Sequence, residues 1–113
     1  MIKKALIMGG TRITMRFAKR FHDKYHLKII DNDRENCENM ATALPDCEIV
    51  LGDGRDIEVL RENNIYQYDA FLALTESSET NILTCLSAKE FGVPKTIADV
   101  ENLQFVSQAE NLN

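Results

Sequence analysis

The chain has 113 residues, of which 44% are hydrophobic and 27% are charged, so it is long enough for one folded domain with its own core. Its net charge of -5, with no basic stripe along the sequence, argues against nucleic acid as a partner. No apolar run approaches the roughly 20 residues of a membrane span, and the three cysteines form no C-x-x-C pair. We therefore predict a single cytoplasmic domain over residues 1–113, without direct membrane insertion, disulfide framework or zinc site.

Strand-like and helix-like stretches alternate from the first residues onward. The apolar run from Lys4 to Met8 predicts a strand. The segment from Arg12 to Phe21 follows, with Ile13, Phe17 and Phe21 at helical spacing, and predicts an amphipathic helix with these three side chains facing the core.

The middle of the chain repeats this alternation. We predict a strand from Leu27 to Asp31, a helix from Arg34 to Leu44 that stops before Pro45, and a third strand from Glu48 to Leu51. The inward face of this helix is expected to consist of Cys37, Met40, Ala41 and Leu44.

The last part of the chain predicts three more helices and two more strands. These are a short helix from Asp56 to Asn63, an almost wholly apolar strand from Ala70 to Leu74, a helix from Glu79 to Phe91, a strand from Lys95 to Val100 and a helix from Asn102 to Glu110. The apolar side chains expected to face the core are Ile57, Leu60, Ile82, Leu83 and Leu86.

This alternation predicts an α/β fold, a Rossmann-like, doubly wound parallel sheet with helices on both faces. Such folds bind ligands at the carboxyl ends of their strands, near the point where the strand order reverses. A sixth strand normally follows the last predicted helix. We therefore expect the chain to be a piece of a larger protein, truncated before that strand.

The first strand-to-helix turn is a degenerate form of the G-x-G-x-x-G dinucleotide fingerprint. Gly9 fits the first position, whereas Thr11 and Thr14 occupy the second and third, and Gly10 lies out of register. The second glycine normally lets backbone approach the phosphates, so a side chain at Thr11 presses on their path. Arg12 lies in the first helical turn, where it can add a contact to phosphate or remain a solvated arginine.

An acid at the end of the second predicted strand supports a nucleotide-binding interpretation of this turn. Asp31 follows Gly9 at about the 20-residue spacing of the acid that binds ribose hydroxyls in this fold. The alternative is that Asp31 is a loop residue or a cap for the next helix.

Several segments of the sequence, taken together, have a familiar order and spacing. They are Leu6–Ile13, Lys28–Arg34, Leu51–Asp56, Ala73–Thr75, Glu79–Leu83 and Ala88–Lys95. The more specific parts are the Gly-Asp-Gly turn and the Glu-Thr-Asn-Ile segment. Nearly the whole chain thereby resembles one known family, the TrkA N-lobe, also called the RCK or KTN domain.

The resemblance implies a cytoplasmic regulatory domain that assembles as a homodimer or a higher ring on a membrane potassium transporter or channel. It also implies binding of NAD(H) or of ATP or ADP, with a change in ring conformation, and a location peripheral to the membrane through the transporter. The implied contacts are with the phosphates for Gly9, Gly10 and Arg12, with the ribose for Asp31, and with the adenosine region for Asp53 and Thr75. Thr11, in the same turn, is also a candidate nucleotide-binding residue.

Three other hypotheses stay open at this stage. Thr11 and Thr14 weaken the site, so the domain can be a degenerate structural or dimerisation lobe that binds no nucleotide. Asp53, Glu76 and Glu79 are oxygen ligands that suit a cation such as calcium. An enzyme is the least favoured reading, because no Tyr-x-x-x-Lys, H-E-x-x-H, G-x-S-x-G or Walker lysine occurs in the sequence.

Overall fold

The computed structural model describes residues 1–101 of the chain, so the predicted helix from Asn102 to Glu110 lies outside the described residues. Strands and helices alternate as expected within that range. The elements are β1 Lys4–Met8, α1 Arg12–Phe21, β2 His26–Asp31, α2 Arg34–Ala43, β3 Glu48–Leu51, α3 Ile57–Glu62, the 3-10 helix η1 Ile65–Gln67, β4 Ala70–Ala73, α4 Ser78–Glu90 and β5 Lys95–Ala98.

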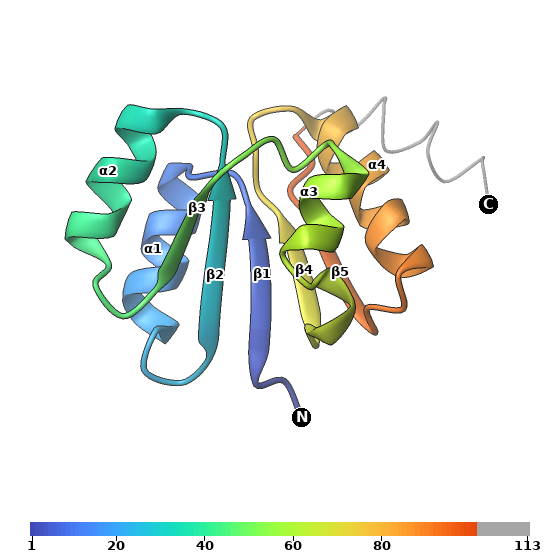
Figure 1. Cartoon of the computed structure of the whole chain (residues 1–113), viewed down its shortest axis with the longest axis horizontal. Coiled ribbons are helices and arrows are strands. Elements are labelled where there is room, and N and C mark those ends of the chain that lie inside the picture. Colours follow the sequence, from blue (N-terminus) through green and yellow to red (C-terminus); the bar gives the residue numbers. More distant parts are fainter. Residues whose placement is uncertain (102–113) are drawn as a thin grey trace.

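The strands of the described region form one five-stranded sheet in the order β3-β2-β1-β4-β5 (Figure 1). Every neighbouring pair is parallel. The chain moves outward in one direction from β1 to β3 and then crosses back to β4, on the other side of β1. The strand order therefore reverses between β1 and β4, and the predicted Rossmann-like, doubly wound sheet is confirmed.

Successive residues of each strand point to opposite faces of the sheet and build two separate cores. On one face Ile7, Leu27 and Ile29 pack with Ala18 of α1 and Met40 of α2. The other face joins side chains of β1, β2 and β4 to buried residues of α3, η1 and α4, which are Leu60, Ile65, Cys85 and Ala88. Because helices cover both faces, the loops at the carboxyl edge are held from both sides.

The inward faces predicted for the helices are partly wrong. Four of the apolar side chains expected in the core are 45–52% exposed; these are Ile13, Ile57, Leu83 and Leu86. Ala41 is exposed as well. The face of α4 that packs on the sheet instead includes the buried polar side chains Asn81 and Thr84.

No helix within residues 1–101 combines the length and the apolar character that crossing a lipid bilayer requires.

Candidate functional site

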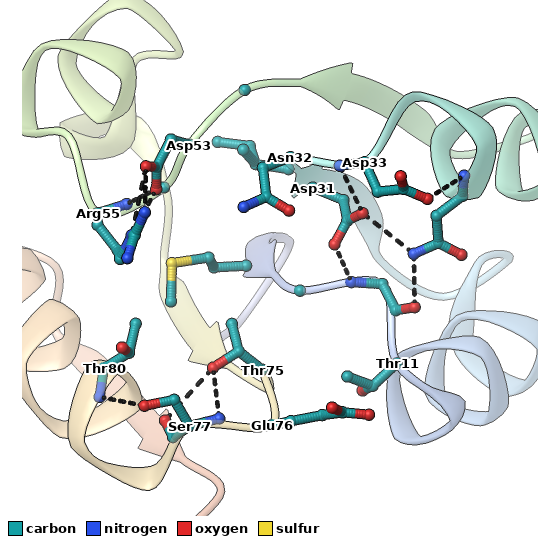
Figure 2. Close-up of a pocket in the computed structure, with 17 residues that line it drawn as sticks. Thr11, Asp31, Asn32, Asp33, Asp53, Arg55, Thr75, Glu76, Ser77 and Thr80 are labelled. Atoms are coloured by element: carbon teal, nitrogen blue, oxygen red, sulfur yellow. Dashed lines mark hydrogen bonds and ion pairs between the residues drawn. The ribbon is translucent and has the colours of Figure 1, made fainter.

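A cavity of about 620 Å³ lies at the carboxyl edge of the sheet, bounded by the loops that follow β1, β2, β3 and β4 (Figure 2). Its size is typical of small-molecule sites. Six of the seven residues predicted for nucleotide binding line it: Gly9, Gly10, Thr11, Asp31, Asp53 and Thr75. The seventh, Arg12, is exposed and is not among the lining residues.

Gly9 adopts a backbone conformation that only glycine tolerates well, with φ at +102°. Its N–H donates to the carbonyl oxygen of Ile30 at 2.9 Å, which ties the turn to the end of β2. A Cβ at this position would lie 2.8 Å from the backbone nitrogen of Thr75, in the loop after β4. The first glycine of the fingerprint therefore allows the β1 and β4 loops to approach each other at the switch point.

The two threonines of the degenerate fingerprint serve the turn itself. Thr11 is the N-cap of α1, and its hydroxyl donates to the carbonyl oxygen of Leu74 at 2.8 Å. Thr14 is fully buried, and its hydroxyl donates to the carbonyl oxygen of Gly9. Thr14 is therefore a packing residue and does not line the cavity, whereas Thr11 does line it.

The first turn of α1 offers backbone N–H groups to an anion, because the first amides of a helix have no partner within it. One of them, the N–H of Thr14, points to the Thr11 hydroxyl at 3.4 Å. The N–H groups of Thr11, Arg12 and Ile13 lie too close to the start of α1 to bond to a carbonyl oxygen within the helix. They form the part of the turn that suits a phosphate.

Asp31, at the end of β2, holds the turn and the following loop together. One carboxylate oxygen accepts from the N–H of Gly10 at 2.9 Å. The other oxygen accepts from the N–H of Asp33 at 3.2 Å and from the side-chain amide of Asn36 at 3.1 Å. The carboxylate of Asp31 therefore joins three segments at the edge of the cavity.

Asp53 and Arg55 form an ion pair after β3 (Figure 2). The Arg55 guanidinium donates to both carboxylate oxygens of Asp53, at 3.0 Å through Nε and at 2.8 Å through Nη2. These hydrogen bonds, together with one from the Arg55 backbone N–H, hold the pKa of Asp53 below its ordinary value. Asp53 is therefore ionised at neutral pH and already has a cationic partner.

Thr75, after β4, is fixed by Asn81 in the first turn of α4. The Asn81 side-chain oxygen accepts from the hydroxyl of Thr75 at 2.6 Å and from its N–H at 3.1 Å. The amide nitrogen of Asn81 donates to the carbonyl oxygens of Thr75 and Asp99, at 2.9 and 2.8 Å. A residue that lines the cavity is thereby connected to the end of β5.

The charged side chains that line the cavity are mostly acidic. They are Asp31, Asp33, Asp53, Glu76 and Arg55. The described part of the chain contains no group of three or more His, Cys, Asp or Glu side chains that could hold a metal ion. The cation hypothesis for Asp53, Glu76 and Glu79 therefore finds no support in the geometry.

Sequence reasoning missed several side chains of this cavity, among them Asn36 and Arg55. Arg55 directly follows the Gly-Asp-Gly turn, which contains the predicted site residue Asp53. Its position in the sequence could therefore have indicated that it belongs to the site. Asn36 had only a positional signal: it lies in the first turn of α2, and first turns of helices meet at the carboxyl edge of such a sheet.

Comparison with known proteins gives one consistent family. The family model of the TrkA-N domain matches residues 5–113. The chain is 34% identical over 104 residues to the Trk system potassium uptake protein TrkA of Vibrio alginolyticus, covering 92% of the chain and 23% of that protein. It is 38% identical over 98 residues to a Trk system potassium uptake protein TrkA homolog of Methanothermobacter thermautotrophicus, covering 86% of the chain and 45% of the relative.

A third relative shows higher identity over a shorter stretch. It is a Trk system potassium uptake protein TrkA homolog of Archaeoglobus fulgidus, 42% identical over 84 residues, which are 74% of the chain and 19% of that protein. The chain spans less than half the length of each of these three relatives.

Proposed function

The chain belongs to the TrkA-N domain family, and from this premise we propose that it is a nucleotide-sensing regulatory domain of a potassium uptake system. Relatives that align with most of the chain are named as Trk system potassium uptake proteins. The proposed ligand is NAD(H) or an adenine nucleotide, ATP or ADP. The proposed partner is a membrane potassium transporter or channel, to which the domain binds from the cytoplasm as a homodimer or a higher ring.

The observation that carries the nucleotide proposal is the placement of two complementary groups in one cavity. The amide groups at the start of α1 suit a phosphate, and the carboxylate of Asp31 suits a ribose hydroxyl. Both lie where the strand order reverses, which is where open α/β sheets bind their ligands. NAD(H) and adenine nucleotides all contain a ribose next to a phosphate chain.

The opposite side of the cavity suits the rest of such a ligand. Asp53 and Arg55 follow β3. In the sheet, β2 with Asp31 lies between β3 and β1, which carries the Gly9–Thr11 turn. A guanidinium can lie flat against an aromatic base, and a carboxylate can accept from an amino group. Thr75 and Ser77, after β4, add hydroxyl groups on the side toward β5.

We propose that the domain regulates by binding and does not catalyse. A nucleotide changes the balance between two conformations only if it binds one of them more tightly. The hydrogen bonds from Thr75 through Asn81 to Asp99 provide a physical link between the cavity and the end of β5. In this proposal, ligand contacts at Thr75 alter the position of the chain after β5 and thereby the packing between subunits.

A structural lobe that binds no nucleotide is the second candidate, and one observation favours it. The N–H of Gly10, the carboxylate of Asp31 and the hydroxyl groups of Thr11 and Thr14 already have partners within the protein. The loops at the cavity are thus held together without a ligand. Side chains at Thr11 and Thr14, where the fingerprint has glycine, are consistent with a lobe that keeps the fold for assembly alone.

Isothermal titration with NADH, ATP and ADP distinguishes the two candidates. The nucleotide proposal expects saturable binding of at least one of them, and a loss of about tenfold or more in Asp31→Ala, because a hydrogen bond to a charged group is removed. The variant Asp23→Ala, at an exposed position after the end of α1 and outside the cavity lining, is the matched control and keeps wild-type affinity. An absence of binding at millimolar nucleotide would contradict the sensor and leave the structural lobe.

A further inference from the structure

We propose that Asn36 is the positioning residue of the candidate nucleotide site, where its side-chain amide holds the Gly9–Thr11 turn against Asp31. This inference rests on the proposed nucleotide-binding function for its effect on affinity. The hydrogen-bonding part of it concerns the protein without ligand and can be tested separately.

The contacts of Asn36 close a ring of hydrogen bonds around one residue of the turn, Gly10. Its side-chain nitrogen donates to the carbonyl oxygen of Gly10 at 2.8 Å and to Asp31 Oδ2 at 3.1 Å. Asp31 Oδ1 in turn accepts from the N–H of Gly10 at 2.9 Å. Both polar atoms of Gly10 are therefore held by the Asp31 and Asn36 pair, which fixes the orientation of the turn.

The backbone of Asn36 is itself anchored, so its side chain is a fixed donor. Asp33 is the N-cap of α2, and its carboxylate accepts from the N–H of Asn36 at 2.9 Å. One turn later in the same helix, Met40 packs in the core under the turn. The contact is so close that a Cβ on Gly10 would lie 2.6 Å from the Asn36 side-chain nitrogen and 2.6 Å from Met40 Cε. A side chain at Gly10, although this position is out of register with the fingerprint, would therefore displace the ends of the Asn36 and Met40 side chains.

This arrangement decides which groups remain for a ligand. A carboxylate has about four acceptor positions, and Asp31 Oδ2 already accepts twice, from Asp33 and Asn36. Oδ1 accepts once, from Gly10, and has one position left for a ribose hydroxyl. The N–H of Gly10 is likewise occupied, so a phosphate is left with the amides of Thr11 and the first turn of α1.

In this proposal, Asn36 therefore holds the carboxylate for the ribose and the turn for the phosphate in a fixed relative position. A change at Asn36 should affect how well the site distinguishes ribose from deoxyribose, because it releases Asp31 Oδ2 and lets the carboxylate rotate. A residue that only stabilises the fold would weaken all nucleotides alike.

The test compares Asn36→Ala with Asn39→Ala, an exposed asparagine of the same helix. Amide hydrogen exchange of Gly10 is measured by NMR in the free proteins, and dissociation constants are measured for ADP and 2′-deoxy-ADP. We expect Gly10 exchange to accelerate by about tenfold or more in Asn36→Ala, affinity for ADP to fall by about tenfold, and the preference for ADP over 2′-deoxy-ADP to narrow. Asn39→Ala should match the wild type in all three measurements.

Two results would overturn the proposal: unchanged Gly10 exchange in Asn36→Ala, or equal losses for both nucleotides with the preference intact. If the wild-type protein binds none of NADH, ATP and ADP, the proposed function fails, and the exchange measurement alone decides whether Asn36 holds the turn. Asn36→Ser, which keeps a shorter polar side chain, replaces the alanine variant if circular dichroism shows that the latter does not fold.

Discussion

The side-chain amide of Asn81 donates a hydrogen bond to the carbonyl oxygen of Asp99, 2.8 Å away, and so joins the first turn of α4 to the end of β5. The oxygen of the same amide accepts from the hydroxyl of Thr75. Asn81 is fully buried, although it lies on a helix next to exposed residues. A single polar side chain thus satisfies backbone groups at the ends of two neighbouring strands.

Replacement of Asn81 by alanine should be strongly destabilising. It leaves the part-buried N–H of Thr75 and the carbonyl oxygens of Thr75 and Asp99 without their partner, and the free energy of unfolding should fall by about 2–4 kcal/mol. Urea denaturation followed by circular dichroism measures the change. The exposed Asn39→Ala is the control, with a change within about 0.5 kcal/mol. Equal stability of the two variants would show that the Asn81 network contributes nothing to folding.

Alanine substitutions at two glycines separate backbone strain from crowding. Gly92, after α4, has φ at +91° and open space where a Cβ would lie, so Gly92→Ala should cost only the backbone strain, about 1–2 kcal/mol. Gly9 has a similar φ, and a Cβ there would lie 2.8 Å from the Thr75 nitrogen. The free energy of unfolding of Gly9→Ala should therefore be about 1–3 kcal/mol lower than that of Gly92→Ala, because the added Cβ is also crowded, as at overpacked sites. Thermal and urea denaturation check this order, and a reversed order would be inconsistent with the close approach of the β1 and β4 loops.

The hydroxyl of Thr14 should contribute to stability at the position where the fingerprint has its third glycine. Thr14→Val keeps the volume of the side chain but removes the donor to the buried carbonyl oxygen of Gly9. We expect the free energy of unfolding to fall by about 1–2 kcal/mol. Thr42→Val is the matched control, because the Thr42 hydroxyl donates to Glu38 on the exposed side of α2. A fall of the same size in both variants would mean that burial of the Thr14 hydroxyl adds nothing.

Asp69 should make stability depend on acidic pH. Its carboxylate accepts from the backbone N–H groups of Lys3 at 2.8 Å and Lys4 at 2.9 Å, and these bonds hold its pKa below the ordinary value of 3.8. The folded state thus favours the ionised form. Its stabilisation is fully present above the ordinary pKa and is lost as the pH falls through the lower pKa of the folded protein.

The variant Asp69→Asn should accordingly lose less stability than the wild type between about pH 5 and about pH 3. Denaturation midpoints in urea at the two pH values give the comparison. Asp23→Asn, at an exposed position after α1, should behave like the wild type. An identical pH dependence in Asp69→Asn would show that the bonds to Lys3 and Lys4 do not favour the ionised carboxylate.

The order and type of the elements could be predicted because apolar runs and turn residues mark them in the sequence. The bounds predicted for β1, α1 and β3 agree with the structure. The buried strand β4 was recognisable from its uninterrupted apolar run, since both of its faces are covered. Within residues 1–101, η1, which consists of Ile65–Gln67, is the one element with no counterpart among the predicted elements.

The inner faces of the helices could not be predicted from hydrophobic spacing alone. Asn81 and Thr14 are polar, so periodicity assigns them to the surface, yet both are buried because they bind backbone groups at strand ends. On α4, the buried side chains Asn81 and Thr84 occupy the inner face, and Leu83 and Leu86 are turned outward. The same limitation applied to the site. Asp31 could be predicted from its sequence spacing to Gly9, whereas the contacts of Asn36 depend on how close the start of α2 lies to the turn after β1.

The position of β1 in the centre of the sheet has a consequence for how the protein acquires its structure. One edge of β1 pairs with β2, which follows closely, but the other pairs with β4, and the bonds from Lys3 to Asp69 span 66 positions of the chain. During synthesis, β1 to β3 can associate long before β4 exists, and the open edge of β1 would then be free to pair with other chains. We expect refolding to be limited by the meeting of these distant strands and to become less efficient as protein concentration rises.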